Sequence, residues 1–198
     1  MKRVCEKLSG RPGFGRMISD AVKALVSGVA LSLTWGSLAS AVRKRYTPAM
    51  PVEIVRRDAG RKFPSRKLKM IALQVLDLVG QSQAELSVAL IGNDEIRELN
   101  ANFRHKDYAT DVLSFGAADE IPGAVRLLGD VVISVEKAQE QARERGLTLN
   151  TEITTLLIHG ILHLLGYDHE RSVKEARVMG RLEKKIYREL CERGILEV

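Results

Sequence analysis

The stretch His159-Gly160-Ile161-Leu162-His163-Leu164-Leu165-Gly166-Tyr167-Asp168-His169 contains three of the four histidines in this 198-residue chain. His159 and His163 are four residues apart, which places their side chains one turn apart on the same face of an α-helix. Gly166 tolerates the positive φ that a helix end requires, and a turn there can bring His169 back towards the other two rings. The pattern predicts three imidazoles that face one point.

Three nitrogen ligands with no fourth protein ligand in the motif are typical of a catalytic zinc site, whereas structural zinc sites are usually closed by four ligands. The alternative is a polar helix end whose histidines are solvated or satisfied in the core. This alternative is disfavoured because the helix is otherwise strongly apolar and a buried imidazole without a partner is costly. We therefore expect one zinc ion per chain, with His159, His163 and His169 as its ligands.

The spacing also matches the long zinc-protease motif H-E-x-x-H-x-x-G-x-x-H at every position but one. Gly160 stands where the proteases carry the glutamate that acts as general base. Without that carboxylate, nothing in the motif can take a proton from zinc-bound water in the protease manner. Three neutral histidines also leave the charge of a divalent ion uncompensated, which suits an anionic substrate such as a phosphodiester.

The charge of the chain is distributed unevenly. The net charge is +6, but residues 1–49 alone hold nine Lys/Arg and two acidic residues, which leaves 22 basic and 23 acidic residues in 50–198. Nucleic-acid binding by the main domain must therefore rest on local patches. The two cysteines, Cys5 and Cys191, suggest no disulfide framework and fit a reducing compartment.

Residues 1–49 form an N-terminal extension that differs from the rest of the chain. Its uncharged run 24–42 is compatible with a short membrane helix or with a secretory signal cleaved near Ala39-Ser40-Ala41. We favour a third interpretation, in which the extension is not part of the functional domain and Met50 is the natural start. The functional domain then spans residues 50–198.

From Met50 onward the pattern predicts an α+β fold, a small mixed sheet of about four strands packed with about five helices, one of which is a zincin-like metal helix. We expect strands over 52–56, 85–91, 112–115 and 128–134, the last two paired, and helices over 65–78, 94–103, 135–145, 149–165 and 172–193. Asn93 is predicted to cap the second helix, and the last helix is expected to carry mixed charges on its outer face. Met179 could lie under the metal, as a methionine does in the zinc proteases, but a core position is the favoured interpretation.

A basic stretch follows the first predicted strand and includes Arg56, Arg57, Arg61 and Lys62. It is either a solvated loop and helix face or an electrostatic track for a phosphate backbone, and the two interpretations are about equally supported.

Several motifs together resemble the YbeY family of bacterial endoribonucleases, the rRNA maturation factors. They are Phe103-Arg104, then Thr110-Asp111-Val112-Leu113-Ser114-Phe115, then Leu128-Gly129-Asp130, and then the histidine stretch. Their order and spacing match over roughly residues 50–190, and the resemblance does not reach residues 1–49. Gly116 departs from the family, which usually has proline there.

The resemblance implies a single-strand-specific metallo-endoribonuclease that acts in maturation of the 16S rRNA 3′ end and in quality control of the 70S ribosome. It implies zinc on His159, His163 and His169, with Arg104 as the catalytic arginine. It also implies a cytoplasmic location and, as partners, single-stranded rRNA and the ribosomal small subunit with its proteins or assembly GTPases. We expect neither DNA nor a membrane as a partner.

The chemistry of individual residues agrees with these roles. Arg104 can hold the scissile phosphate and stabilise the charge that develops on it. Asp168 or a backbone carbonyl is a candidate to orient a ligand histidine through its second ring nitrogen. Tyr167 could stack on a base, although packing beside the metal helix is the favoured interpretation, and His105 is read as a surface residue. No general base is evident, so the nucleophile is either metal-bound hydroxide or the 2′-OH of the RNA.

Two other functional classes stay open. A metalloprotease would need a base that replaces the missing glutamate, and casein cleavage abolished by a chelator would identify one. A non-catalytic ribosome-assembly factor would use the metal for structure only. In that case His159→Ala would unfold the helix end, while Arg104→Ala would leave function intact.

Overall fold

The computed structural model describes residues 51–61, 63–117, 126–169 and 171–196. Within them the chain forms four strands, one short 3-10 helix and five α-helices: β1 (Val52–Arg56), η1 (Asp58–Gly60), α3 (Ser65–Leu78), β2 (Glu85–Ile91), α4 (Asn93–Arg104), β3 (Val112–Gly116), β4 (Leu127–Ser134), α5 (Val135–Arg145), α6 (Leu149–Leu164) and α7 (Val173–Glu192). The predicted α+β class is confirmed. The predictions for residues 1–49 and for Lys62 lie outside the described residues.

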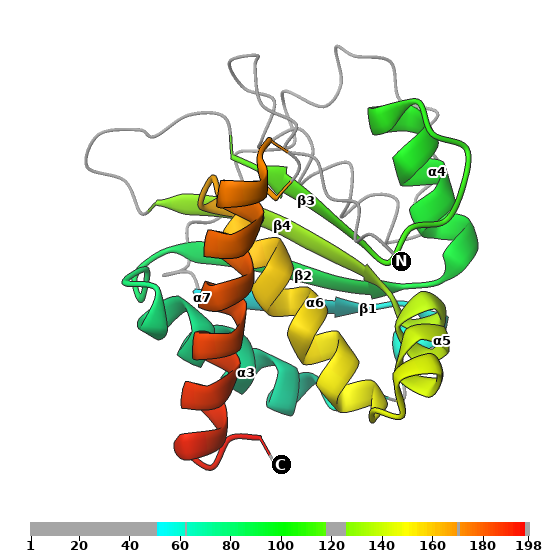
Figure 1. Ribbon diagram of the computed structural model, residues 1–198. Helices are drawn as coiled ribbons and strands as arrows, with labels where there is room; N and C mark the ends of the chain where they lie inside the picture. Colours follow the sequence, from blue (N-terminus) through cyan, green and yellow to red (C-terminus); the bar gives the residue numbers. More distant parts are fainter. Residues whose placement is uncertain (1–50, 62, 118–125, 170, 197–198) are drawn as a thin grey trace, which may run out of the picture.

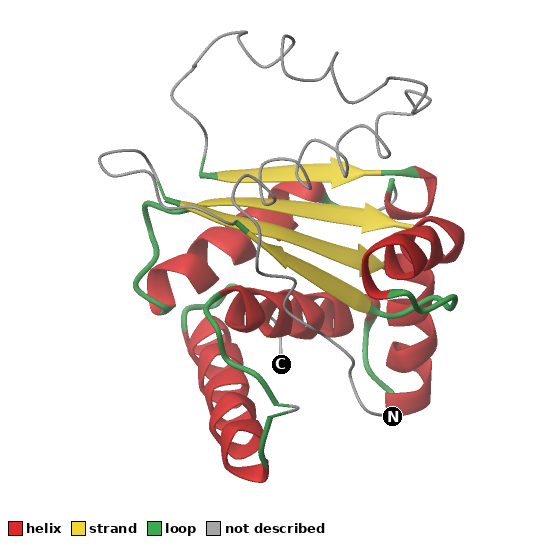
Figure 2. Cartoon of the chain, turned by 90° about the horizontal axis from the view of Figure 1, so that it is seen from above, coloured by secondary structure: helices red, strands yellow, loops and turns green. Residues whose placement is uncertain are grey.

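The four strands form one mixed sheet in the order β1-β2-β4-β3 (Figure 2). β1, β2 and β4 run parallel to one another, whereas β3 pairs antiparallel with β4, with Val112 opposite Ile133. The predicted pairing of the last two strands is therefore confirmed. β1 and β3 are the two outer strands of the sheet.

Alternation along the strands gives the sheet two apolar faces. One face packs against α3, α6 and α7, and its strand residues include Val88, Leu90, Val112, Val131 and Ile133. In Figure 1, α6 and α7 lie in front of the sheet and α3 lies below it. The opposite face packs against α4 through a smaller cluster made of Ala89, Ile91, Ile96, Leu99, Leu113, Phe115 and Val132. The predicted metal helix therefore lies in the larger of the two cores.

The start of α4 differs from the sequence prediction. Gly92 is the N-cap residue, and its backbone N–H donates a hydrogen bond to the Glu95 carboxylate at 2.8 Å. Asn93 is already the first helical residue, and its side-chain oxygen accepts a hydrogen bond from the Ser134 hydroxyl at 2.7 Å. The prediction that Asn93 caps the helix was wrong because this side chain bonds to the end of β4 instead.

α6 is buried almost all round, and it contacts β3, β4, α3, α5 and α7. It approaches the sheet closely at Gly160, whose carbonyl accepts a hydrogen bond from the Ser114 hydroxyl at 3.2 Å. A Cβ atom on Gly160 would lie 2.7 Å from a methyl carbon of Val131, well inside van der Waals contact. The position that holds the glutamate in the protease motif thus faces the sheet here and has no room for a side chain.

No helix among the described residues has both the length and the apolar character needed to cross a bilayer.

We predict that Gly160→Ala destabilises the fold by about 1–3 kcal/mol, because the added methyl group forces α6 away from β4. Gly180→Ala is the matched control, since it also adds a methyl group to a helix but no atom lies within 4 Å of the new Cβ. The control should raise stability by up to about 1 kcal/mol. Urea unfolding of both variants makes the measurement, and equal stability of Gly160→Ala and wild type would contradict the close approach.

Candidate metal centre

The end of α6 and the turn after it position the three histidines. His159 and His163 lie one turn apart near the end of the helix. The N–H of Gly166 donates to the carbonyl of His163 at 2.9 Å, and the N–H of Tyr167 donates to the carbonyl of Leu162 at 3.1 Å. Gly166 has a φ of 94°, so the predicted positive φ is confirmed. These bonds satisfy the last carbonyls of the helix and direct the chain back to His169.

The three imidazoles converge on one point. Their ring centroids are 4.6 Å apart for His159 and His163, 5.1 Å for His159 and His169, and 5.2 Å for His163 and His169. Each histidine offers one ring nitrogen to the cluster, and these three nitrogens all lie within 4.8 Å of one another. The Nε2 atoms of His159 and His163 are 3.1 Å apart. This is a group that could hold a metal ion, and three imidazole nitrogens suit zinc.

The protonation state of His163 favours metal binding. Burial, together with the neighbouring His159 and His169, lowers its pKa from 6.5 to about 4, while Asp168 and Glu183 act in the opposite direction. The imidazole is therefore neutral at pH 7 and offers a lone pair, as a metal ligand must.

Glu183 on α7 completes the cluster, and the sequence interpretation did not include it. One of its carboxylate oxygens lies 2.5 Å from Nδ1 of His159. A carboxylate that accepts a hydrogen bond from Nδ1–H fixes the proton on that nitrogen and leaves the Nε2 lone pair directed at the site. A signal was present in the sequence, because Glu183 lies four residues after Met179 and three before Ile186, both on the buried face of α7.

Glu183 therefore fills for His159 the orienting role that the sequence suggested for Asp168 or a backbone carbonyl. The carboxylate of Asp168 is 3.2 Å from Nε of Arg171. A role for Asp168 towards another ring stays a prediction. Met179 is buried in the main core, in agreement with its interpretation as a packing residue.

Two other residues that the sequence singled out lie at the surface. His105 is exposed, as predicted. Tyr167 exposes 38% of its surface, which is more than the favoured packing role would leave.

Arg104 is the last residue of α4 and only 8% exposed. α4 and α6 pack on opposite faces of the sheet, so the sheet lies between the element that carries Arg104 and the element that carries His159 and His163. The joint action of Arg104 and the histidines stays a prediction.

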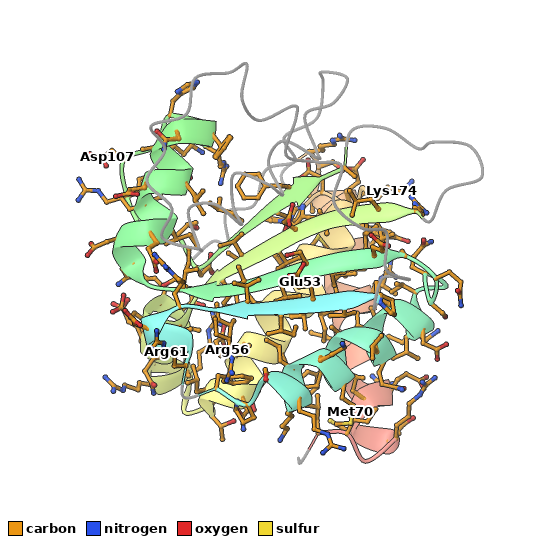
Figure 3. All side chains as sticks on the ribbon, turned by 180° about the vertical axis from the view of Figure 1, so that it is seen from behind. Glu53, Arg56, Arg61, Met70, Asp107 and Lys174 are labelled. Carbon is orange, nitrogen blue, oxygen red and sulfur yellow. The ribbon has the colours of Figure 1, made fainter. Side chains whose placement is uncertain are left out.

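The basic stretch after β1 is largely engaged within the protein. Nη1 of Arg56 donates to the carbonyls of Arg61 and Phe63, at 3.2 and 2.8 Å. Arg57 forms an ion pair with Glu95 at 2.8 Å, and Arg61 forms one with Asp58 at 3.1 Å. Figure 3 shows Arg56 and Arg61 far across the molecule from Lys174 at the start of α7. An RNA-binding role for these arginines stays a prediction.

The fold and the histidine cluster define an α+β protein with a zincin-like three-histidine motif on its central helix. The sequence profile of the family described as "Endoribonuclease YbeY" matches residues 53–191, and the chain belongs to this family.

Curated relatives agree with this assignment. Endoribonuclease YbeY of Sulfurihydrogenibium sp. is 45% identical over 141 residues, which are 71% of this chain and 90% of the relative. Its counterpart in Geobacter metallireducens is 39% identical over 150 residues, 74% of this chain and 100% of the relative. The solution structure of TM1509 from Thermotoga maritima matches with a TM-score of 0.50 and 27% identity, and the match covers 74% of this chain and 96% of that one.

We predict that Glu183→Gln weakens zinc binding by about 10- to 100-fold, because an uncharged amide holds the His159 tautomer less firmly. Competition with a chromophoric chelator measures the affinity. Glu189→Gln is the matched control, since it makes the same change on the same helix and should leave zinc affinity unaltered. Wild-type zinc affinity in Glu183→Gln would refute the orienting role.

Proposed function

We propose that this protein is a metal-dependent endoribonuclease, a hydrolase that cleaves phosphodiester bonds in single-stranded RNA. The observation that carries the proposal is the convergence of three imidazoles on α6 and its following turn, with Gly160 in place of the protease base. Membership of the YbeY family supports an RNA substrate.

The proposed cofactor is one zinc ion per chain on His159, His163 and His169. Bound zinc supplies a Lewis acid that polarises a phosphate oxygen or activates water. The chain contributes three neutral ligands, so the positive charge of the ion stays available to attract a phosphodiester. The hydrogen bond from His159 to Glu183 keeps one of these ligands in the tautomer that binds metal.

Other side chains are assigned either to contacts with the RNA or to the support of a metal ligand. Arg104 holds the scissile phosphate through its fork of N–H groups and stabilises the charge that develops during cleavage. The exposed ring of Tyr167 offers a surface on which a base can stack. Asp168 is assigned to the orientation of a ligand ring. Arg56, Arg57, Arg61 and Lys62 stay proposed as more distant RNA contacts.

The biological setting is proposed from the family resemblance. We infer a cytoplasmic role in rRNA processing, at the 3′ end of 16S rRNA, and in quality control of the 70S ribosome, with the small subunit and its assembly factors as partners. We also infer that residues 50–198 form the functional domain, and the family match from residue 53 onward supports this.

We predict that Arg104→Ala reduces single-stranded RNA cleavage by about 100-fold or more while it retains bound zinc, because the arginine acts on the phosphate and not on the metal. His163→Ala should lose both zinc and cleavage. Gel-based cleavage assays and metal analysis of each purified variant make the measurement.

His105→Asn is the control for the adjacent position, because asparagine tolerates the φ of 57° found there and the side chain is exposed. This variant should cleave RNA like wild type. Equal residual cleavage in wild type, Arg104→Ala and His163→Ala would indicate a contaminating nuclease, and the protein would then be better described as a metal-stabilised assembly factor.

The products of cleavage distinguish the two nucleophiles. Either nucleophile must lose a proton, so the missing base at position 160 does not choose between them. When the 2′-OH of the RNA attacks, the 5′-oxygen of the next nucleotide leaves, and we predict a 2′,3′-cyclic phosphate on one product and a 5′-hydroxyl on the other. Mass spectrometry of the products from an oligonucleotide makes the test, with the same oligonucleotide bearing one 2′-O-methyl group at the cleaved position as control. A 5′-phosphate on the downstream product, with no cyclic phosphate, would establish direct attack by water.

A further inference from the structure

The outward side of α7 carries a continuous basic surface, which we call the α7 basic face. It consists of Lys174, Arg177, Arg181, Lys184, Lys185 and Arg188, all of which are exposed. At 3.6 residues per turn these six positions fall within an arc of about 100°, opposite the buried Met179, Ile186 and Leu190. The acidic residues Glu175, Glu183 and Glu189 lie outside this arc. Glu192 at the C-terminal end of α7 falls within the arc, one turn beyond Arg188, so the outermost face carries one sign only from Lys174 to Arg188.

The six cations are not used to hold the described fold together. None of these side chains forms an ion pair or a hydrogen bond with another described residue, whereas Arg57, Arg97 and Arg145 each pair with a carboxylate. Like charges three or four residues apart, such as Arg177 and Arg181, destabilise a helix. A concentration of this kind, in a domain with slightly more acidic than basic residues, points to an anion outside the chain.

We propose that the α7 basic face binds the sugar-phosphate backbone of single-stranded RNA beside the metal centre, an inference that rests on the proposed nuclease function. The face extends about 21 Å from Lys174 to Arg188 at a rise of about 1.5 Å per residue. At about 3.4 Å per stacked nucleotide, this length accommodates roughly six phosphates of one strand.

The position of α7 connects this face to the cleavage site. Glu183, which contacts His159, directly precedes Lys184, and the two side chains point about 100° apart around the helix axis. RNA held along α7 therefore lies on the helix that orients a proposed metal ligand, with the middle of the α7 basic face about 150° around the helix axis from Glu183.

Two other polyanionic partners fit the surface less well. A helix that binds a membrane surface inserts its apolar face, but the apolar face of α7 is buried in the core. A protein partner is usually anchored by apolar and aromatic contacts at the centre of its interface, and the centre of this face contains only charged side chains. A regular array of cations without an apolar centre suits a repeating phosphate backbone.

The test uses the full chain with zinc and a fluorescent single-stranded RNA of about twelve nucleotides, roughly twice the length of the face. The RNA carries 2′-O-methyl groups throughout, so that binding is measured apart from attack by a 2′-OH. The test variant is Arg177→Gln/Arg181→Gln. The matched control is Arg66→Gln/Arg143→Gln, which removes two exposed arginines from α3 and α5 and leaves the same net charge. Glutamine maintains the helix in both variants.

We expect the test variant to weaken binding on the order of tenfold and to reduce the slope of log K against log salt by about 1.4, the share of two phosphate contacts. The control variant should match wild type both in its affinity for the RNA and in the salt dependence of binding. Equal losses of RNA affinity in the two variants would show that only net charge matters and would overturn the proposal. Unchanged RNA binding by the test variant would also overturn it. Binding of polyglutamate or phosphatidylserine vesicles through Arg177 and Arg181 as tightly as RNA would also overturn it.

Cleavage is measured separately on unmodified RNA, so the two proposals fail in different ways. Cleavage by wild type together with unaltered binding by Arg177→Gln/Arg181→Gln overturns the basic face but not the nuclease. Binding that depends on these two arginines, in a wild-type protein that does not cleave, supports the basic face and overturns the nuclease.

Discussion

The close approach of α6 to the sheet at Gly160 is the constraint on which the site depends. The missing Cβ allows the helix to lie against Val131 and to accept a hydrogen bond from Ser114. Because α6 is fixed there, the neighbouring His159 has a defined direction and depth, and it is almost fully buried. The glycine that removes the protease base from the motif thus also sets the position of the proposed metal ligands. The spacing of the histidines accounts for the likeness to the zinc proteases, and Gly160 accounts for the departure from them.

Much of the fold follows from local patterns in the sequence. The largely apolar runs of β2 and β4 and the apolar character of α6 identify these elements within a few residues, since strands covered on both faces are buried along almost their whole length. The histidine cluster is equally accessible, because four-residue spacing and a glycine after the helix determine its geometry almost alone. The N-cap residue of α4 could not be identified from local sequence. The Asn93 side chain bonds instead to Ser134, which is 41 residues away in sequence.

The same distinction applies within the site. Glu183 reaches His159 from the helix that follows the motif, 24 residues further along the chain. Its spacing from Met179 and Ile186 places it near the buried face of α7, but no spacing rule identifies His159 as its partner. Arg56 and Arg57 read as free cations in the sequence, whereas the fold supplies the carbonyls of residues 61 and 63 for the first and Glu95 for the second. Charge composition therefore says little about which cations are available to a ligand. Only the tertiary partners separate cations used for structure from those left for binding.

α7 combines three functions that its helical period keeps apart. Its apolar stripe packs into the core, one flank presents Glu183 to His159, and the outer face gathers the unpaired cations. Packing determines the position of the helix, and that position sets both the orientation of a proposed metal ligand and the place where a phosphate backbone can lie. A substitution in the buried stripe, such as Met179→Ala, therefore moves both surfaces together, whereas a substitution on the outer face changes binding alone. The separation of these effects along one helix makes substrate capture and metal orientation independently adjustable within a small domain.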